Sequence, residues 1–308
     1  MCSGIPIIHV VRQIREVMWR RSDRNRRRPR VGLALSGGAA RGIAHVGVLK
    51  VLAANNVPID CIAGTSAGAI VAGAFAAGMS LDEIEEIGRR LRWRDVGRVA
   101  FSRLGIQSNE RLERMIRQRF PVTRFEHLRI PFAAVATDLQ TGAPVILRDQ
   151  GDLAFAIRAS CTLPGWYVPV TDSQGRQLVD GGLVANVPVT ATRELGAEVV
   201  IAVDVNAEGA KFMGAPQSAI GVLLQAMLCV QRIATSHQLA QADVIIKPAV
   251  GHIRWDEMTR ADELIEAGAQ AARESLDEIR RLISPPAEES RSILWRWFHS
   301  REAETAGD

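Results

Sequence analysis

The chain has 308 residues, 47% of them hydrophobic and 23% charged, which is ordinary for a soluble globular protein and allows a sizeable core. Its net charge of +4 hides an asymmetry, because residues 1–30 carry nine arginines against two acidic residues, which leaves a net charge of −3 for the rest. The four cysteines form no Cys-x-x-Cys pair, which argues against a disulfide framework and a zinc site. We therefore expect one domain in a reducing compartment, without metal or cofactor.

Residues 1–30 are predicted to form a basic amphipathic helix followed by an Arg-rich arm. Apolar residues recur from Ile7 to Met18 at spacings of three and four, and Arg12 and Arg15 fall on the other face. This helix either docks on the domain or contacts an anionic membrane, and the sequence leaves both options open. The start of the chain lacks the pattern of a secretory signal, so we expect a cytoplasmic protein, which the arm could hold at the inner membrane face. Nucleic acid is not an expected partner, because no folded basic module accompanies the arm.

The segment from residue 31 to 63 predicts two β-α units in immediate succession. An apolar strand, Val31 to Leu35, is followed by the glycine-rich loop 36–42 and by a helix from Ile43 to Ala54, and a second strand covers Ile59 to Ala63. Alternating elements of this kind indicate a parallel sheet covered by helices. The glycine-rich loop exposes backbone N–H groups at the carboxyl edge of that sheet, where it could serve an oxyanion, a phosphate group or only a structural turn.

The stretch Gly64-Thr65-Ser66-Ala67-Gly68 has the Gly-x-Ser-x-Gly pattern of a nucleophile elbow between a strand and a helix. Residues 61–81 contain no charged side chain and would be long enough to cross a bilayer. They are rich in Gly and Ala, however, and begin like a strand, so we interpret them as a buried strand-turn-helix. Ser66 is then the first candidate for chemistry.

The rest of the chain continues the α/β pattern up to residue 283. We predict helices over 81–91, 109–120, 152–160, 219–240 and 260–282, strands over 132–138, 144–147, 177–179 and 199–205, and a further core segment over 243–247. Residues 284–308 form a polar tail that starts at Pro285-Pro286 and contains Trp295 and Trp297. The predicted organisation is therefore an arm over 1–30, a catalytic domain over 31–283 and a tail over 284–308.

A serine nucleophile needs a base. The candidates are Asp180, His237 and His252, which all follow Ser66 in the chain. A Ser-His-Asp arrangement could use His237 or His252, but the first lies inside a long helix and the second in a polar loop. Asp180 ends a short apolar strand and precedes two glycines, so its carboxylate can be presented at the sheet edge. Burial beside an apolar pocket raises the pKa of a carboxylate and makes it a stronger base. A dyad of Ser66 and Asp180 is chemically sufficient.

Four ordered blocks over about residues 31–282 resemble the patatin-like phospholipases, and most closely the bacterial group related to the neuropathy target esterase catalytic domain. These blocks are Gly37-Gly38-x-x-Arg41-Gly42, Gly64-x-Ser66-x-Gly68, Ala159-Ser160 with Pro164, and Asp180-Gly181-Gly182. The resemblance implies an α/β fold of three layers, α/β/α, with a mainly parallel central sheet. It also implies that Ser66 is the nucleophile, Asp180 its partner, Gly37, Gly38 and Ala39 the oxyanion hole, Arg41 and Gly42 the residues that position that loop, and Gly64 and Gly68 the glycines of the elbow. Ala39 departs from the family pattern, which usually has a third glycine there.

We therefore expect a serine hydrolase of lipid acyl esters, with a phospholipid, a lysophospholipid or a simpler acyl ester as substrate. The apolar segments 70–79 and 163–170 are candidates for the walls of an acyl-chain pocket. The alternative is a regulatory or adaptor protein of the same fold that acts by binding a partner, with weak or vestigial esterase activity.

Overall fold

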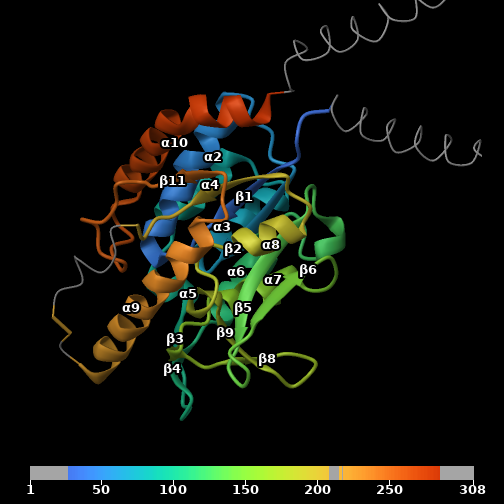
Figure 1. Cartoon of the computed structure of the whole chain (residues 1–308). Coiled ribbons are helices and arrows are strands. Elements are labelled where there is room, and N and C mark those ends of the chain that lie inside the picture. Colours follow the sequence, from blue (N-terminus) through green and yellow to red (C-terminus); the bar gives the residue numbers. More distant parts are fainter. Residues whose placement is uncertain (1–26, 208–214, 217, 285–308) are drawn as a thin grey trace, which may run out of the picture. The chain divides into compact units, whose positions relative to one another are not determined.

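The computed structural model describes residues 27–207, 215–216 and 218–284 (Figure 1). Residues Arg30–Leu282 group into one compact unit. The predicted amphipathic helix, most of the Arg-rich arm and the polar tail lie outside the described residues. The functions suggested for them therefore stay predictions.

The described elements follow the predicted order, with several short additions. The helices are the 3-10 helix η1 (Ala39–Ile43), α2 (Ala44–Ala54), α3 (Ala67–Ala76), α4 (Leu81–Arg90), α5 (Trp93–Val96), α6 (Glu110–Arg119), the 3-10 helix η2 (Phe125–His127), α7 (Leu153–Ser160), the 3-10 helix η3 (Gly181–Leu183), α8 (Val189–Glu194), α9 (Ala219–Leu239) and α10 (Ala261–Ile283). The strands are β1 (Val31–Leu35), β2 (Cys61–Thr65), β3 (Arg98–Val99), β4 (Gly105–Ser108), β5 (Phe132–Asp138), β6 (Pro144–Arg148), β7 (Gly165–Tyr167), β8 (Val170–Thr171), β9 (Gln177–Asp180), β10 (Val199–Val203) and β11 (Val244–Ile246).

The central sheet has the order β11-β10-β1-β2-β5-β9-β8, with β6 also paired to β5. The five strands from β11 to β5 are parallel, whereas β6, β8 and β9 pair antiparallel with their neighbours. This arrangement confirms the predicted α/β fold with a mainly parallel sheet. A separate small sheet, β3-β4-β7, was not predicted, because strands of two to four residues leave little periodicity in the sequence.

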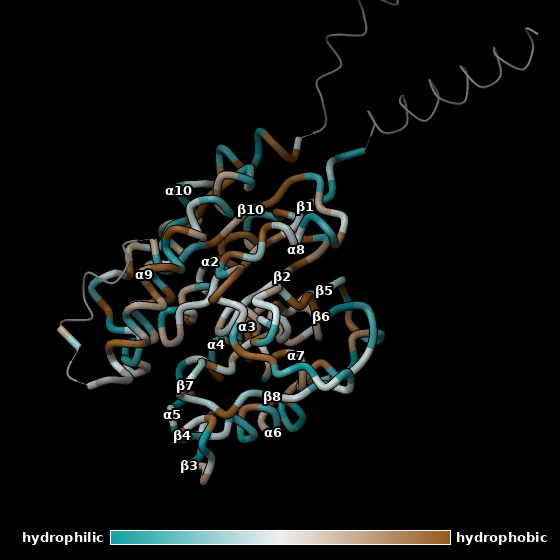
Figure 2. The backbone as a smooth tube through the Cα atoms, turned by 60° about the horizontal axis from the view of Figure 1, so that its bottom comes forward, coloured by the Kyte–Doolittle hydropathy of each residue, from teal (hydrophilic) through white to brown (hydrophobic). Residues whose placement is uncertain are grey.

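Two faces of the central sheet carry different side chains, and each is covered by helices. The register places Ala202, Ala34, Ala63 and Ala133 in one row across four strands, and these alanines pack in one buried cluster with residues of α8. Because side chains alternate along a strand, the larger residues Leu33, Ile62 and Phe132 point to the opposite face. Helix α3 contacts β2 and β5 there. Figure 2 shows hydrophobic segments through the central strands and hydrophilic ones in the outer loops.

The uncharged stretch 61–81 folds as the predicted buried strand-turn-helix, formed by β2 and α3. The second strand begins at Cys61 and ends at Thr65, two residues later at each end than predicted. The reason is that Pro58 and Asp60 belong to the turn, where the Asp60 carboxylate accepts a hydrogen bond from the Val31 N–H at 2.7 Å. Among the described residues, every helix is too short or too polar to span a lipid bilayer.

Helices α2 and α10 pack backbone to backbone at two glycines. A Cβ atom added at Gly47 would collide with the carbonyl oxygen of Ile265, and one added at Gly268 would collide with that of Ala44. Glycine is therefore required at both positions by the close approach of the two helices, although it weakens each helix by itself.

We predict that Gly268→Ala lowers the free energy of unfolding by about 1–3 kcal/mol, as overpacking does, even though alanine is the better helix former. Urea denaturation followed by circular dichroism measures this change. Gly88→Ala in α4 is the matched control, because a Cβ there meets only Ile43, at 3.5 Å, and it should cause no loss. Equal losses for both variants would contradict the backbone contact.

Candidate active site

Ser66 forms a strained turn between β2 and α3. Its φ of 54° and ψ of −125° lie outside the regions that non-glycine residues usually adopt. The flanking glycines allow the strand and the helix to approach, since a Cβ at Gly64 would collide with the Gly68 carbonyl and a Cβ at Gly68 with the Leu35 carbonyl. Helix α3 then starts directly after Ser66, so its N-terminal dipole end lies next to the hydroxyl.

The backbone of this turn is fixed by Ser160 at the end of α7. The Ser66 N–H donates to Ser160 Oγ at 2.9 Å, and the Ser160 hydroxyl donates in turn to the Val135 carbonyl at 2.6 Å. Ser160 is fully buried, so it links the elbow to the neighbouring strand β5 without competition from water.

Asp180 is a buried carboxylate beside Ser66, with 4% of its surface exposed. Its Oδ1 accepts a hydrogen bond from the Gly182 N–H at 2.8 Å, and its backbone N–H donates to the Thr162 carbonyl at 2.8 Å. Burial raises the pKa of Asp180 to about 6, although the Ser66 hydroxyl and the Gly182 N–H favour the ionised form and lower it. Its Oδ2 is buried and forms no hydrogen bond of good geometry with the described residues, so Ser66 lies close without a fully formed bond.

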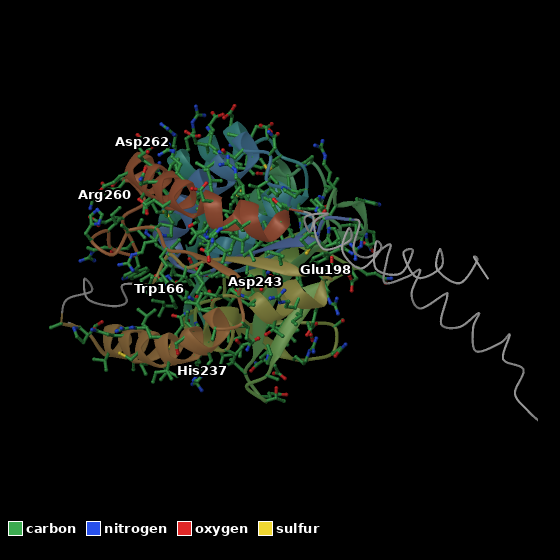
Figure 3. The ribbon with its side chains drawn as sticks, turned by 45° about the horizontal axis from the view of Figure 1, so that its top comes forward. Trp166, Glu198, His237, Asp243, Arg260 and Asp262 are labelled. Atoms are coloured by element: carbon green, nitrogen blue, oxygen red, sulfur yellow. The ribbon has the colours of Figure 1, made fainter. Side chains whose placement is uncertain are left out.

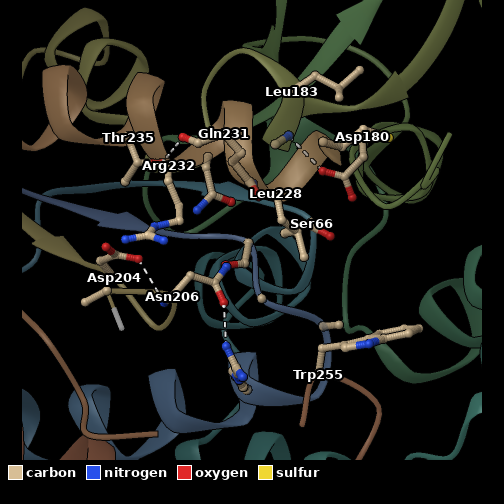
Figure 4. Close-up of a pocket in the computed structure, with 18 of the residues that line it drawn as sticks. Ser66, Asp180, Leu183, Asp204, Asn206, Leu228, Gln231, Arg232, Thr235 and Trp255 are labelled. Carbon is tan, nitrogen blue, oxygen red and sulfur yellow. Dashed lines mark hydrogen bonds between the residues drawn. The ribbon is translucent and has the colours of Figure 1, made fainter. Parts of the chain in front are cut away.

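The sheet register explains why Ser66 and Asp180 meet although 114 positions separate their residue numbers. Thr65 pairs with Val135 on β5, so Ser66 follows at the level of Ala136, and Ala136 pairs with Asp180 on β9. Figure 4 shows the Asp180 carboxylate and the Ser66 hydroxyl pointing toward one another.

The glycine-rich loop after β1 passes beside Ser66. The N–H of Gly37 donates to the Asn186 carbonyl at 3.1 Å, so it is already engaged. The N–H groups of Gly38 and Ala39 donate no hydrogen bond to any described residue. Ala39 has a φ of 49°, which is the left-handed region where glycine is favoured. The loop thus has a left-handed conformation at a residue that carries a Cβ atom.

Arg41 and Gly42 keep the glycine-rich loop in position. The buried Arg41 guanidinium donates to the carbonyls of Ile253 at 2.7 Å and Gly251 at 3.3 Å, and to Asn206 Oδ1 at 3.3 Å. Asn206 itself donates to the Gly37 carbonyl at 2.9 Å. At Gly42, a Cβ would collide with that of Ala67, the residue after Ser66. These contacts couple the loop to the elbow and to residues 251–253.

The histidines considered as bases lie away from this arrangement. His237 is exposed on α9 (Figure 3), and His252 is an exposed residue that pairs with Glu263 at 2.6 Å. His45 is fully buried below the glycine loop, where burial lowers its pKa to about 4 and its Nε2 hydrogen-bonds the Ser36 carbonyl at 2.9 Å. No histidine is found among the described residues that line the cavity at Ser66.

That cavity has a volume of about 340 Å³ and a mixed lining. Ser66, Asp180, Gly38 and Ala39 open into it, together with the charged side chains of Asp204, Arg232 and Lys247. Asp204 is buried and its pKa is raised by that burial. The described residues contain no group of three or more His, Cys, Asp or Glu residues that could hold a metal ion.

Sequence reasoning did not identify three residues of the site: Asn186, Asn206 and Trp255. Asn186 is buried, and its Oδ1 has no hydrogen-bond partner among the described residues. Its backbone carbonyl accepts a hydrogen bond from the Gly37 N–H. Trp255 accepts a hydrogen bond from the Ala40 N–H at 2.9 Å through its carbonyl and lines the cavity. Asn186 and Trp255 make their contacts through backbone carbonyls, and Asn206 makes its contact through the side-chain amide. No local sequence pattern therefore marks these three residues. Ser160 carried a signal, because it lies in one of the four sequence blocks.

Known proteins resemble this chain over the segment that carries the site. A family model described as patatin-like phospholipase matches residues 33–193. An NTE family protein of Mycobacterium tuberculosis is 40% identical over 181 residues, which cover 58% of this chain and 49% of the relative. Lysophospholipase NTE1 of Mycosarcoma maydis is 34% identical over 183 residues, which cover 57% of this chain and 10% of the relative.

Among solved structures, VipD from Legionella pneumophila matches with a TM-score of 0.49 and 14% identity, over 81% of this chain and 67% of that one. The chain spans about half the length of the mycobacterial relative. Since the family model matches more than half of the residues, the chain belongs to the patatin-like phospholipase family, with NTE family proteins among its relatives.

Proposed function

We propose that the protein hydrolyses carboxylic esters of lipids through an acyl intermediate on Ser66, with Asp180 as the base. The observation that carries the proposal is the approach of a strained, solvent-reachable serine to a buried carboxylate of raised pKa. Beside them lie two backbone N–H groups that donate no hydrogen bond to any described residue. The family supplies the reaction class, and a relative named a lysophospholipase supports a phospholipid or lysophospholipid substrate.

The first half of the reaction forms the acyl intermediate. Asp180 accepts the proton of the Ser66 hydroxyl while Oγ attacks the ester carbonyl carbon. The carbonyl oxygen becomes an oxyanion, which the N–H groups of Gly38 and Ala39 and the N-terminus of α3 stabilise. When the C–O bond to the alcohol breaks, the protonated Asp180 gives its proton to the leaving oxygen.

The second half releases the acid. Asp180, again ionised, accepts a proton from a water molecule that attacks the acyl carbonyl, and the bond to Ser66 Oγ then breaks. The proton returns from Asp180 to Ser66. Gly37 acts in both halves by shaping the loop, because the Asn186 carbonyl engages its N–H.

A helix beside the cavity favours a substrate that is held in a lipid surface. One side of α9 lines the cavity through Leu228, Gln231 and Thr235, whereas Val230 and Ile233 on the same helix are 65% and 69% exposed. Exposed groups of large apolar side chains commonly mark contact with lipid or protein. The contact of residues 1–30 with an anionic membrane remains a separate proposal.

Ser66→Ala and Asp180→Asn should each abolish hydrolysis of p-nitrophenyl butyrate, because one removes the nucleophile and the other the base. The rates are measured with purified protein whose folding is checked by circular dichroism. His237→Ala and His252→Ala are the controls and should keep wild-type activity. A folded but inactive histidine variant would contradict the dyad. Absence of Ser66 labelling by a fluorophosphonate in folded wild-type protein would favour the adaptor alternative.

The pH dependence should report the raised pKa of Asp180. A base with a pKa of about 6 is ionised above that pH and protonated below it, so kcat/KM should fall as the pH decreases through about 6. At pH 5 we expect roughly a tenth of the plateau value. If kcat/KM instead fell only near pH 4, the pKa range of an ordinary aspartate, burial would not raise the pKa of Asp180.

The double variant Val230→Ser, Ile233→Ser should lower the rate on phospholipid vesicles severalfold, because it removes apolar contact area, and leave hydrolysis of dissolved p-nitrophenyl butyrate unchanged. Liposome sedimentation of the same protein measures the loss of binding. Equal rates for wild type and variant on vesicles would exclude this surface from lipid contact.

A further inference from the structure

A second cavity adjoins Ser66. Its volume is about 100 Å³, and three residues, Ser66, Ala39 and Leu163, line both cavities. The second cavity is bounded by residues of η1, α2, α3, α4, α5 and α6, and none of the described residues that line it is charged.

Two polar side chains in the wall of the second cavity, Asn109 and Trp93, already have hydrogen-bond partners. Asn109 is buried, donates to the Arg158 carbonyl and to Thr162 Oγ1, both at 3.0 Å, and accepts from Arg158 Nε at 3.0 Å. Trp93 Nε1 donates to the Asp256 carbonyl at 2.9 Å. Most of the other described residues of the wall are apolar, so the cavity suits an apolar occupant.

The acyl chain and the alcohol portion of an ester bound at Ser66 fit different cavities. When the carbonyl carbon lies at Ser66 Oγ and its oxygen at the N–H groups of Gly38 and Ala39, the acyl chain and the alcohol leave the carbonyl in different directions. The first cavity contains Asp204, Arg232 and Lys247 and suits a polar alcohol portion, whereas the second suits a hydrocarbon chain.

We propose that the second cavity holds the acyl chain and that Gly88 sets the length of chain that it accepts; this rests on the proposed hydrolase function. Gly88 lies in α4 and lines the cavity. A Cβ atom added there would meet only the side chain of Ile43, at 3.5 and 3.9 Å, and Ile43 lines the same cavity. Neither distance is a collision, so the glycine is not required by helix packing, and its missing side chain leaves the cavity open.

The test compares chain lengths in Gly88→Leu and wild type with p-nitrophenyl acetate, butyrate and octanoate. The leucine side chain should fill the cavity, so the ratio of kcat/KM for octanoate to that for acetate should fall at least about tenfold, as a methylene-sized misfit does. Acetate hydrolysis should stay within about twofold of wild type. Gly88→Ala should shift the ratio in the same direction by less.

Arg90→Leu is the matched control, because it adds the same side chain to α4 at a position that is 78% exposed; its ratio should equal that of wild type. Calorimetric titration of Ser66→Ala with decanoic acid gives a second measurement that needs no catalysis, and Gly88→Leu should weaken this binding about tenfold. An unchanged ratio in a Gly88→Leu variant that hydrolyses acetate normally would overturn the acyl-chain assignment and leave the hydrolase proposal standing. Wild-type protein that hydrolyses no ester but binds decanoic acid in a Gly88-dependent way would reject the hydrolase function and keep the chain site.

Discussion

The strained turn at Ser66 is the constraint on which the rest of the site depends. The backbone conformation of a serine at φ 54° is unfavourable by itself. It persists because neighbouring contacts hold the residue in place. Gly64 and Gly68 let β2 and α3 approach until their backbones touch, and Ser160 holds the Ser66 N–H against β5. The same close approach brings the N-terminus of α3 next to the Ser66 hydroxyl.

In the proposed reaction, Asp180 takes the place that a histidine has in other serine hydrolases. A solvated aspartate is too weak a base to take a proton from a serine hydroxyl, whereas desolvation raises the pKa of Asp180 to about 6. The two hydrogen bonds of its backbone, to Thr162 and from Thr137, keep the carboxylate at this position. Ionisation of a buried carboxylate costs folding stability, and the proposed reaction requires this ionised form.

Two residues with strained backbone conformations line both cavities. Among the described residues, four non-glycine residues have positive φ, and two of them, Ala39 and Ser66, line both cavities. An alanine in the left-handed region pays a conformational cost that a glycine avoids. In this conformation Gly38 and Ala39 line the cavity together with Ser66, and hydrogen bonds of Arg41 and Asn206 hold the loop in place.

The sequence by itself determined the local parts of this protein. Hydrophobic strands such as Val31–Leu35, the Gly-x-Ser-x-Gly turn and the glycine-rich loop are encoded within a few residues, so their patterns predicted the parallel sheet and the elbow. The four ordered blocks also indicated the family.

Only the tertiary structure decided how distant segments meet. The register from β2 through β5 to β9 aligns Ser66 with Asp180, the Asn186 carbonyl engages the Gly37 N–H, and residues of several helices enclose an apolar cavity beside the serine. Such contacts join backbone atoms and side chains that are far apart in the chain, and no local pattern of residues encodes them.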